Sequence, residues 1–294
     1  MRSHYPFSAG ESLPGTRLPE GACDAHVHVY DSSTPAVPGA RLHPPHASVD
    51  DYRHVQARMG TTRTVLVTPS TYGSNNAPML AALATLGPSA KGVAVIRGDE
   101  SDAHLRQLDA LGVCGVRINL SMGATNDARS IAHIADRIAP LGWHLQLLMP
   151  SDQLLTLEPV LRSLPVDLVF DHFARIAPGQ CGQPAHALVL DLLHSGRAWI
   201  KLSGGYLVSA TCSTEDPALD ALARSYLDAV PARVVWGSDW PHATASAGLQ
   251  PMPDDARQID RLVQWAGSAV CLQQILVTNP ERLYGFAPIT HTQA

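Results

Sequence analysis

Short apolar runs alternate along this chain with segments of helical periodicity, and that alternation limits the folds open to it. Eight runs have the pattern of strands, and they read DAHVHV, TVLVTP, GVAVI, GVRINL, HLQLLM, LVFDH, WIKLSG and VVWGSDW. Helical periodicity marks the segments 102–111, 131–141, 153–164, 219–230 and 256–265. Several of the helical patterns close on Gly or Pro shortly before the next strand.

Strands that alternate with helices favour parallel βαβ units. Eight such units in 294 residues predict a closed (β/α)8 barrel forming a single domain over residues 1–294, with its core at about 21–286. The alternative is an open doubly wound sheet, which would want a Gly-rich phosphate turn after the first strand, and the sequence has none there. We expect the Pro-rich segment 33–48 to be a long loop at the active site.

The amino-acid composition limits the kinds of molecule that this protein is expected to bind. The net charge is −5, charged residues make up 16% of the chain, and no basic run occurs, which argues against nucleic acid and anionic membranes. No uninterrupted apolar window of 18 residues and no signal-like apolar core appear. The five cysteines stand apart without a C-x-x-C motif. We therefore expect a reduced, cytoplasmic protein, and the sequence leaves open whether its copies form a homo-oligomer.

Polar residues recur at the carboxyl ends of the predicted strands, where barrels of this kind carry their active sites. The first strand predicts that Asp24, His26 and His28 project to one face, because alternate residues of a strand share a face. The residues in the inward phase at the strand ends are His26, His28, Thr68, Ser70, Arg117, Asn119, Gln146, His172, Lys201, Ser203 and Asp239. Because polar residues stand at the carboxyl ends of so many strands, we expect them to line a single cavity.

Two chemical interpretations follow from this set. Three histidines and Asp239 form a donor set that suits a divalent ion such as Zn or Mn. Lys201 is either catalytic or a buried structural charge, and in the second case we expect Asp24 to be its partner, because a buried ammonium needs one.

Four segments, DAHVHVYD, FDHFAR, WIKLSGGY and VVWGSDWPH, resemble the amidohydrolase superfamily. Within it they are most similar to the branch of 2-pyrone-4,6-dicarboxylate lactonase and related lactone hydrolases, which TNPERLYGF also matches. The similarity runs over residues 21–286. It implies a distorted (β/α)8 barrel and a hydrolytic site.

The resemblance also implies roles for single residues. The catalytic set would be His26, His28, His172 and Asp239, and the substrate contacts would include Ser70, Arg117, Arg175 and His242. Neither HLQLLM nor GVRINL offers the lysine whose carbamate bridges two metals in other members, so one ion or none is expected. Leu207 stands where many relatives are expected to have an arginine, which bears on whether the substrate has a second carboxylate there.

The function expected is hydrolysis of a small acidic lactone, of the 2-pyrone-dicarboxylate, muconolactone or sugar-acid lactone type. Asp239 would activate water, and the histidines would stabilise the oxyanion directly or through a metal ion. Arg117 and Arg175 would hold a substrate carboxylate, with Gln146, Tyr72 and Tyr206 as further substrate contacts. The alternatives are a metal-dependent decarboxylase of an aromatic or dienoic acid, a sugar-acid lactone isomerase, and a ligand-binding barrel without chemistry.

Overall fold

Eight parallel strands pair in chain order and confirm the predicted (β/α)8 barrel. The computed structural model describes residues 5–122 and 128–289. The strands are β1 Cys23–Val27, β2 Arg63–Val67, β3 Ala90–Ala94, β4 Val113–Asn119, β5 His144–Leu148, β6 Leu168–Phe170, β7 Ala198–Ser203 and β8 Val234–Gly237. Each differs from its predicted run by a few residues at the ends. β6 and β8 stop shortly before the polar residues expected there, and β1 includes His26 but stops before His28.

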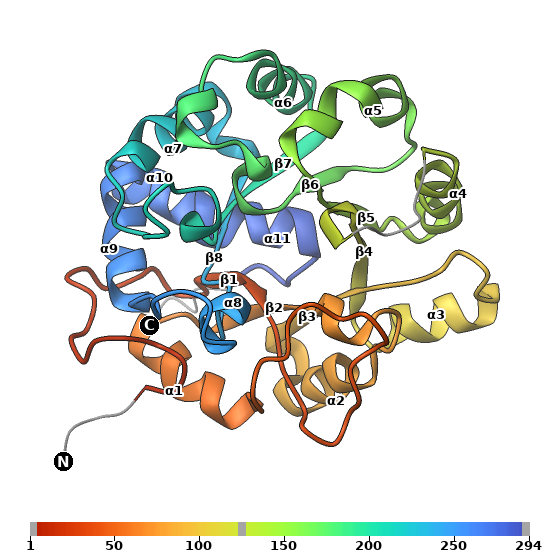
Figure 1. Ribbon diagram of the computed structural model, residues 1–294, viewed down its shortest axis with the longest axis horizontal. Helices are drawn as coiled ribbons and strands as arrows, with labels where there is room; N and C mark the ends of the chain where they lie inside the picture. The colour runs from red at the N-terminus through yellow and green to blue at the C-terminus, as the bar shows by residue number, and fades with distance from the viewer. Residues whose placement is uncertain (1–4, 123–127, 290–294) are drawn as a thin grey trace.

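Helices surround the strands as an outer ring, except that α8 (Ala243–Ser246) and α11 (Asn279–Tyr284) lie over the middle of the barrel in the view of Figure 1. They are α1 Val49–Met59, α2 Ala77–Leu86, α3 Asp102–Ala110, α4 Ala128–Ile138, α5 Ser151–Ser163, α6 Pro184–His194, α7 Ala218–Ala229, α8 Ala243–Ser246, α9 Asp255–Ala266, α10 Ala269–Gln273 and α11 Asn279–Tyr284. All five predicted helical segments are present. Local chemistry sets their ends: Ser48 and Asp51 form a capping box at the start of α1, and Gly60 closes it with a φ of 84°.

The barrel closes between β1 and the chain that follows β8. The His28 amide donates to the Trp240 carbonyl at 2.8 Å, and the Asp239 amide donates to the His26 carbonyl at 2.9 Å. Gly237 makes this approach possible, because a Cβ there would lie 2.5 Å from the Cβ of His26. The seam of the barrel thus fixes His26, His28 and Asp239 relative to one another.

The prediction that Asp24 shares a face with His26 and His28 is wrong. The pairing of β1 with β2 shifts register between Asp24 and Val27, and such a bulge breaks the alternation of side chains. The Asp24 carboxylate accepts hydrogen bonds from Tyr52 of α1 and from Ser238, whereas His26 contacts groups inside the barrel. Burial raises the pKa of Asp24 to about 6.

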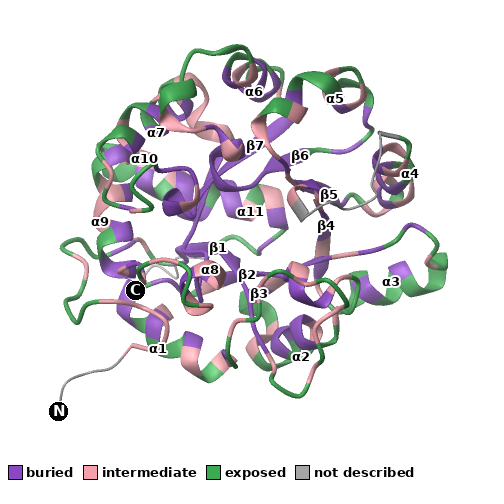
Figure 2. Ribbon diagram, viewed as in Figure 1, coloured by how far each residue is buried: buried purple, intermediate pink, exposed green. Residues whose placement is uncertain are grey.

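Buried apolar residues form one cluster that includes the strands and the surrounding helices and a second cluster inside the barrel. Figure 2 shows the buried residues concentrated on the strands and on parts of the surrounding helices. The interior cluster includes Cys23, Val65, Val93, Val169, Trp199 and Val235. This cluster lies inside the barrel below the polar residues at the carboxyl ends of the strands. No helix in the described part of the chain is long and apolar enough to cross a membrane.

The close approach at Gly237 yields a test of the seam. We expect Gly237→Ala to lower the free energy of unfolding by about 1–3 kcal/mol, because the added methyl overlaps His26 in a packed interior. Denaturant unfolding followed by circular dichroism measures the change. Gly179→Ala is the matched control, since a Cβ at that exposed position meets nothing within 4 Å. Equal stabilities for the two variants would contradict this account of the seam.

Candidate active site

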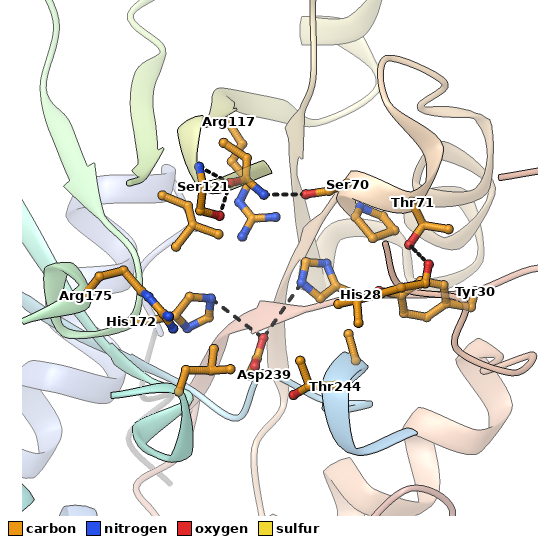
Figure 3. A pocket seen from close by; sticks show the side chains of 16 residues that line it. His28, Tyr30, Ser70, Thr71, Arg117, Ser121, His172, Arg175, Asp239 and Thr244 are labelled. Atoms are coloured by element: carbon orange, nitrogen blue, oxygen red, sulfur yellow. Dashed lines mark hydrogen bonds and ion pairs between the residues drawn. The ribbon is translucent and has the colours of Figure 1, made fainter. Parts of the chain in front are cut away.

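Three imidazoles and one carboxylate meet at the carboxyl end of the barrel. The Nε2 atoms of His26, His28 and His172 lie 3.6, 3.8 and 4.0 Å from Oδ1 of Asp239. The Nε2 atoms of His26 and His28 are 3.2 Å apart. Figure 3 shows His28 and His172 on either side of Asp239. The structure therefore brings together the four residues that the sequence predicted as a set.

Unusual backbone conformations present these side chains. The four residues from His172 to Arg175 have positive φ angles of 49–56°, and Asp239 has a φ of 68°. Such values are uncommon for residues with a Cβ, and they cluster at functional sites. The left-handed turn after β6 directs both His172 and Arg175 to the pocket.

Burial and neighbouring charges decide the protonation of the set. Burial, aided by the nearby Arg117, lowers the pKa of His28 to about 4, and burial lowers the pKa values of His26 and His172 as well. Burial alone would raise the pKa of Asp239, but the imidazoles and the Tyr206 hydroxyl, which donates to Oδ2, bring it below its usual range. At neutral pH the site holds neutral imidazoles beside an ionised carboxylate.

A second charged layer lies directly beneath, centred on Asp171. This fully buried carboxylate accepts hydrogen bonds at Oδ2 from Arg117 Nε and Gln146 Nε2, both at 3.0 Å. Its Oδ1 lies 3.3 Å from both Lys201 Nζ and His26 Nδ1. Lys201 is thus a paired buried charge, but the predicted partner Asp24 is wrong. The bulge in β1 turns Asp24 away, and Asp171 takes that place.

Sequence reasoning missed Asp171 and Tyr30. Asp171 stands beside the predicted His172, so strand alternation assigned it to the opposite face, but β6 already ends at Phe170. Tyr30 lines the pocket with its ring 6.3 Å from that of His28. It continues the series of His26 and His28 at the same spacing, and that signal was present in the sequence.

A pocket of about 200 Å³ opens above the four residues. Its lining residues are His28, Tyr30, Leu42, Pro69, Ser70, Thr71, Arg117, Asn119, Ser121, Leu148, His172, Arg175, Leu207, Asp239, Ala243 and Thr244. Leu42 belongs to the Pro-rich loop, which therefore reaches the site as expected. Figure 3 shows Arg175 beside His172 and Arg117 across the pocket from Asp239.

The other predicted substrate residues divide into two groups. Ser70 and Arg175 line the pocket, as does Arg117. Gln146 is fully buried between Asp171 and Lys201, and the Tyr72 hydroxyl bonds the main chain of Asp31.

Two more residues predicted as substrate contacts lie behind Asp239. Tyr206 is buried and donates to its carboxylate, and His242 Nε2 lies 3.2 Å from Asp255 Oδ2. Neither is among the residues that line the pocket. Tyr206 thus contacts the Asp239 carboxylate directly, and His242 lies 3.4 Å from the Tyr206 hydroxyl.

The donor atoms fit a divalent ion. A tetrahedral zinc with ligands about 2 Å away needs ligand–ligand distances of roughly 3.3 Å. The Nε2 atoms of His26 and His28 lie 3.2 Å apart, and each of the three imidazoles lies 3.6–4.0 Å from Asp239 Oδ1. The donor atoms of His26, His28 and Asp239 all lie within 4.8 Å of one another. His28 Nδ1 is 2.7 Å from the Val67 carbonyl, so its Nε2 keeps the lone pair that a metal requires. The residues present, three imidazoles and a carboxylate, therefore match the chemistry of a single-ion site.

Comparison with known proteins agrees with this geometry. The amidohydrolase family model matches residues 23–286. The chain belongs to the amidohydrolase family. A 2-pyrone-4,6-dicarboxylate hydrolase from Comamonas testosteroni is 32% identical, with 94% of each chain covered. These matches confirm the resemblance seen in the four sequence segments.

Two further family members are similar over most of their length. A D-galactarolactone isomerase from Agrobacterium fabrum is 28% identical, covering 96% of this chain and 97% of the relative. A crystal structure of a probable 2-pyrone-4,6-dicarboxylic acid hydrolase from Acinetobacter baumannii, with citric acid bound, has a TM-score of 0.78 at 28% identity. That match covers 90% of this chain and all of the other.

The buried layer yields a prediction about stability and pH. Asp171→Asn leaves Lys201 and Arg117 without their carboxylate, so we expect a loss of about 3–5 kcal/mol in unfolding free energy at pH 7. The cations Lys201 and Arg117 outweigh burial and hold the pKa of Asp171 well below its usual range. Its contribution is therefore complete above the unfolded pKa of about 3.9 and disappears as the pH falls below it.

Unfolding free energies of both proteins from pH 3 to 8 measure this. The difference should be constant above about pH 5 and narrow below about pH 4. Asp99→Asn, in an exposed pair with Arg97, is the control and should change stability by less than about 1 kcal/mol. A difference that does not depend on pH would show that Asp171 is not ionised in the folded protein.

Proposed function

We propose that this amidohydrolase opens a small acidic lactone by hydrolysis. The observation that carries the proposal is the ionised Asp239 carboxylate, ringed by three neutral imidazoles and facing a pocket that also holds two arginines. The similarity to lactone-acting relatives supports the same reaction class. We propose the cytoplasm as its location, which five unpaired cysteine thiols support.

Asp239 is the proposed general base. It removes a proton from water as the water oxygen bonds to the lactone carbonyl carbon. The ring C–O bond then breaks, and the same carboxyl returns the proton to the leaving oxygen. The Tyr206 hydroxyl holds Oδ2, which leaves Oδ1 facing the imidazoles and the water.

The arginines supply the positive charge that such a substrate needs. Arg117 donates from Nε to Asp171, which is its one hydrogen bond within residues 5–122 and 128–289, so its terminal nitrogens face the pocket. The half-buried Arg175 makes no hydrogen bond or ion pair within the same ranges. Two guanidinium groups with free donors suit a carboxylate and the developing oxyanion.

A single divalent ion is compatible with this scheme. His26, His28 and Asp239, whose donor atoms lie within 4.8 Å of one another, would hold it together with His172, and it would polarise the carbonyl and acidify water. Arg117 and Arg175 would orient the substrate in the same way with or without the ion.

Isomerisation of a sugar-acid lactone is the second candidate, favoured by the similarity to D-galactarolactone isomerase. The two reactions differ in their products. Hydrolysis releases a new carboxylic acid and one proton at neutral pH, whereas isomerisation releases neither. A panel of acidic lactones followed by proton release and by product NMR separates them.

Asp239→Asn tests the proposed base. The change keeps shape and one hydrogen-bond acceptor but removes the base, so we expect kcat to fall by at least about 10²-fold. Lactone turnover by wild type and variant gives the ratio, and thermal unfolding confirms the fold. A variant with near wild-type turnover would place the base elsewhere.

Arg175→Gln tests recognition of the substrate anion. We expect KM for an acidic lactone to rise by about tenfold or more, because a charge-assisted contact is lost, while kcat changes less. For the methyl ester of the same lactone, the substitution should change KM little, because the ester has no carboxylate for Arg175 to bind. Arg224→Gln on the exposed side of α7 is the matched control. Equal losses for acid and ester would assign Arg175 another role.

A further inference from the structure

Lys201 is one of two lysines in the chain, and it is fully buried beneath the histidines. Three acceptors surround its Nζ: Gln146 Oε1 at 2.9 Å, His26 Nδ1 at 3.1 Å and Asp171 Oδ1 at 3.3 Å. An ammonium has three N–H donors and no acceptor, and here it has two acceptors in hydrogen-bond geometry and the Asp171 carboxylate as its ion-pair partner. The contact with His26 therefore has a fixed direction, in which Lys201 donates and Nδ1 accepts.

The other ring nitrogen of His26 agrees with that direction. A neutral imidazole whose Nδ1 accepts must carry its proton on Nε2. His28 Nδ1 lies 2.7 Å from the Val67 carbonyl, which can only accept, so His28 is protonated on Nδ1 and its Nε2 accepts. His26 Nε2 then donates to His28 Nε2 across 3.2 Å, with the Asp239 carboxylate as a second acceptor nearby.

One contact favours the opposite tautomer. His26 Nδ1 also lies 3.3 Å from Asp171 Oδ1, and a proton on Nδ1 would be attracted to that carboxylate. Among the residues that the structure describes, however, this oxygen has no partner in hydrogen-bond geometry. The Lys201 ammonium, which donates to Nδ1, therefore decides between the two tautomers of His26 and favours the one protonated on Nε2.

We propose that Lys201 is a positioning residue that fixes His26 in the tautomer protonated on Nε2. His26 is then a donor toward the layer formed by His28, His172 and Asp239, which we call the reacting layer, and its Nε2 must give up this proton before it can bind a divalent ion. Lys201 thereby lowers the affinity of the site for such an ion, as partners behind a metal ligand commonly change affinity by about 10–100-fold. The tautomer and the ion affinity do not depend on the proposed lactone hydrolysis.

Histidine NMR tests the tautomer in the resting protein. Long-range ¹H–¹⁵N spectra of ¹⁵N-histidine-labelled wild type distinguish the two tautomers, and the signals that disappear in His26→Gln identify His26. We expect His26 protonated on Nε2 and His28 protonated on Nδ1. His26 protonated on Nδ1 in the wild type would overturn the proposal, whatever the reaction proves to be.

Lys201→Met tests the cause. The variant retains the Arg117–Asp171 pair, so local charge stays balanced. We expect His26 to move to the Nδ1 tautomer, directed to Asp171, and the association constant for zinc ions alone, measured by calorimetry, to rise by about 10–100-fold. Lys91→Met, at the half-buried lysine of β3, should change neither. A folded Lys201→Met protein with an unchanged His26 tautomer would overturn the proposal, and the wild-type spectrum decides it if that variant does not fold.

Discussion

The buried carboxylate of Asp171 is the interaction on which the rest of the site depends. It contacts Arg117 of β4, Gln146 of β5, Lys201 of β7 and His26 of β1. One side chain at the end of β6 thus joins residues from four other strands at a single level of the barrel. A buried carboxylate is stable only when it is paired with positive charge. Without Asp171, the buried cations Arg117 and Lys201 would in turn lose their carboxylate partner, which would lower the stability of the fold. The same contacts that neutralise Asp171 hold His26 and Arg117 in place.

The reacting layer stands directly on this charged layer. His28, His172 and Asp239 come from chain segments just past strand ends, where left-handed backbone and the barrel seam determine their directions. Buried, hydrogen-bonded support below the reacting layer preorganises its donors for a developing charge. The arginines connect the layers, since Arg117 is anchored by Asp171 at Nε and exposed to substrate at its far end.

Local patterns predicted most of the fold and the four converging residues. Alternation of apolar residues identified all eight strands, and barrel geometry then placed His26, His28, His172 and Asp239 at one mouth. The failures have a common physical origin in contacts between residues far apart in sequence. A bulge in β1, invisible in the sequence, moved Asp24 to the helix side, and the early end of β6 brought Asp171 inside. The partner of Lys201 could not be known before those two details.

In the proposed reaction, water held by Asp239 attacks the carbonyl of a bound lactone. Turnover in H₂¹⁸O, with mass spectrometry of the product, tests it most directly. Hydrolysis by this route places one ¹⁸O atom in the new carboxylate for each turnover of an acidic lactone. A product formed without incorporation of solvent oxygen would contradict hydrolysis and would favour rearrangement within the same pocket.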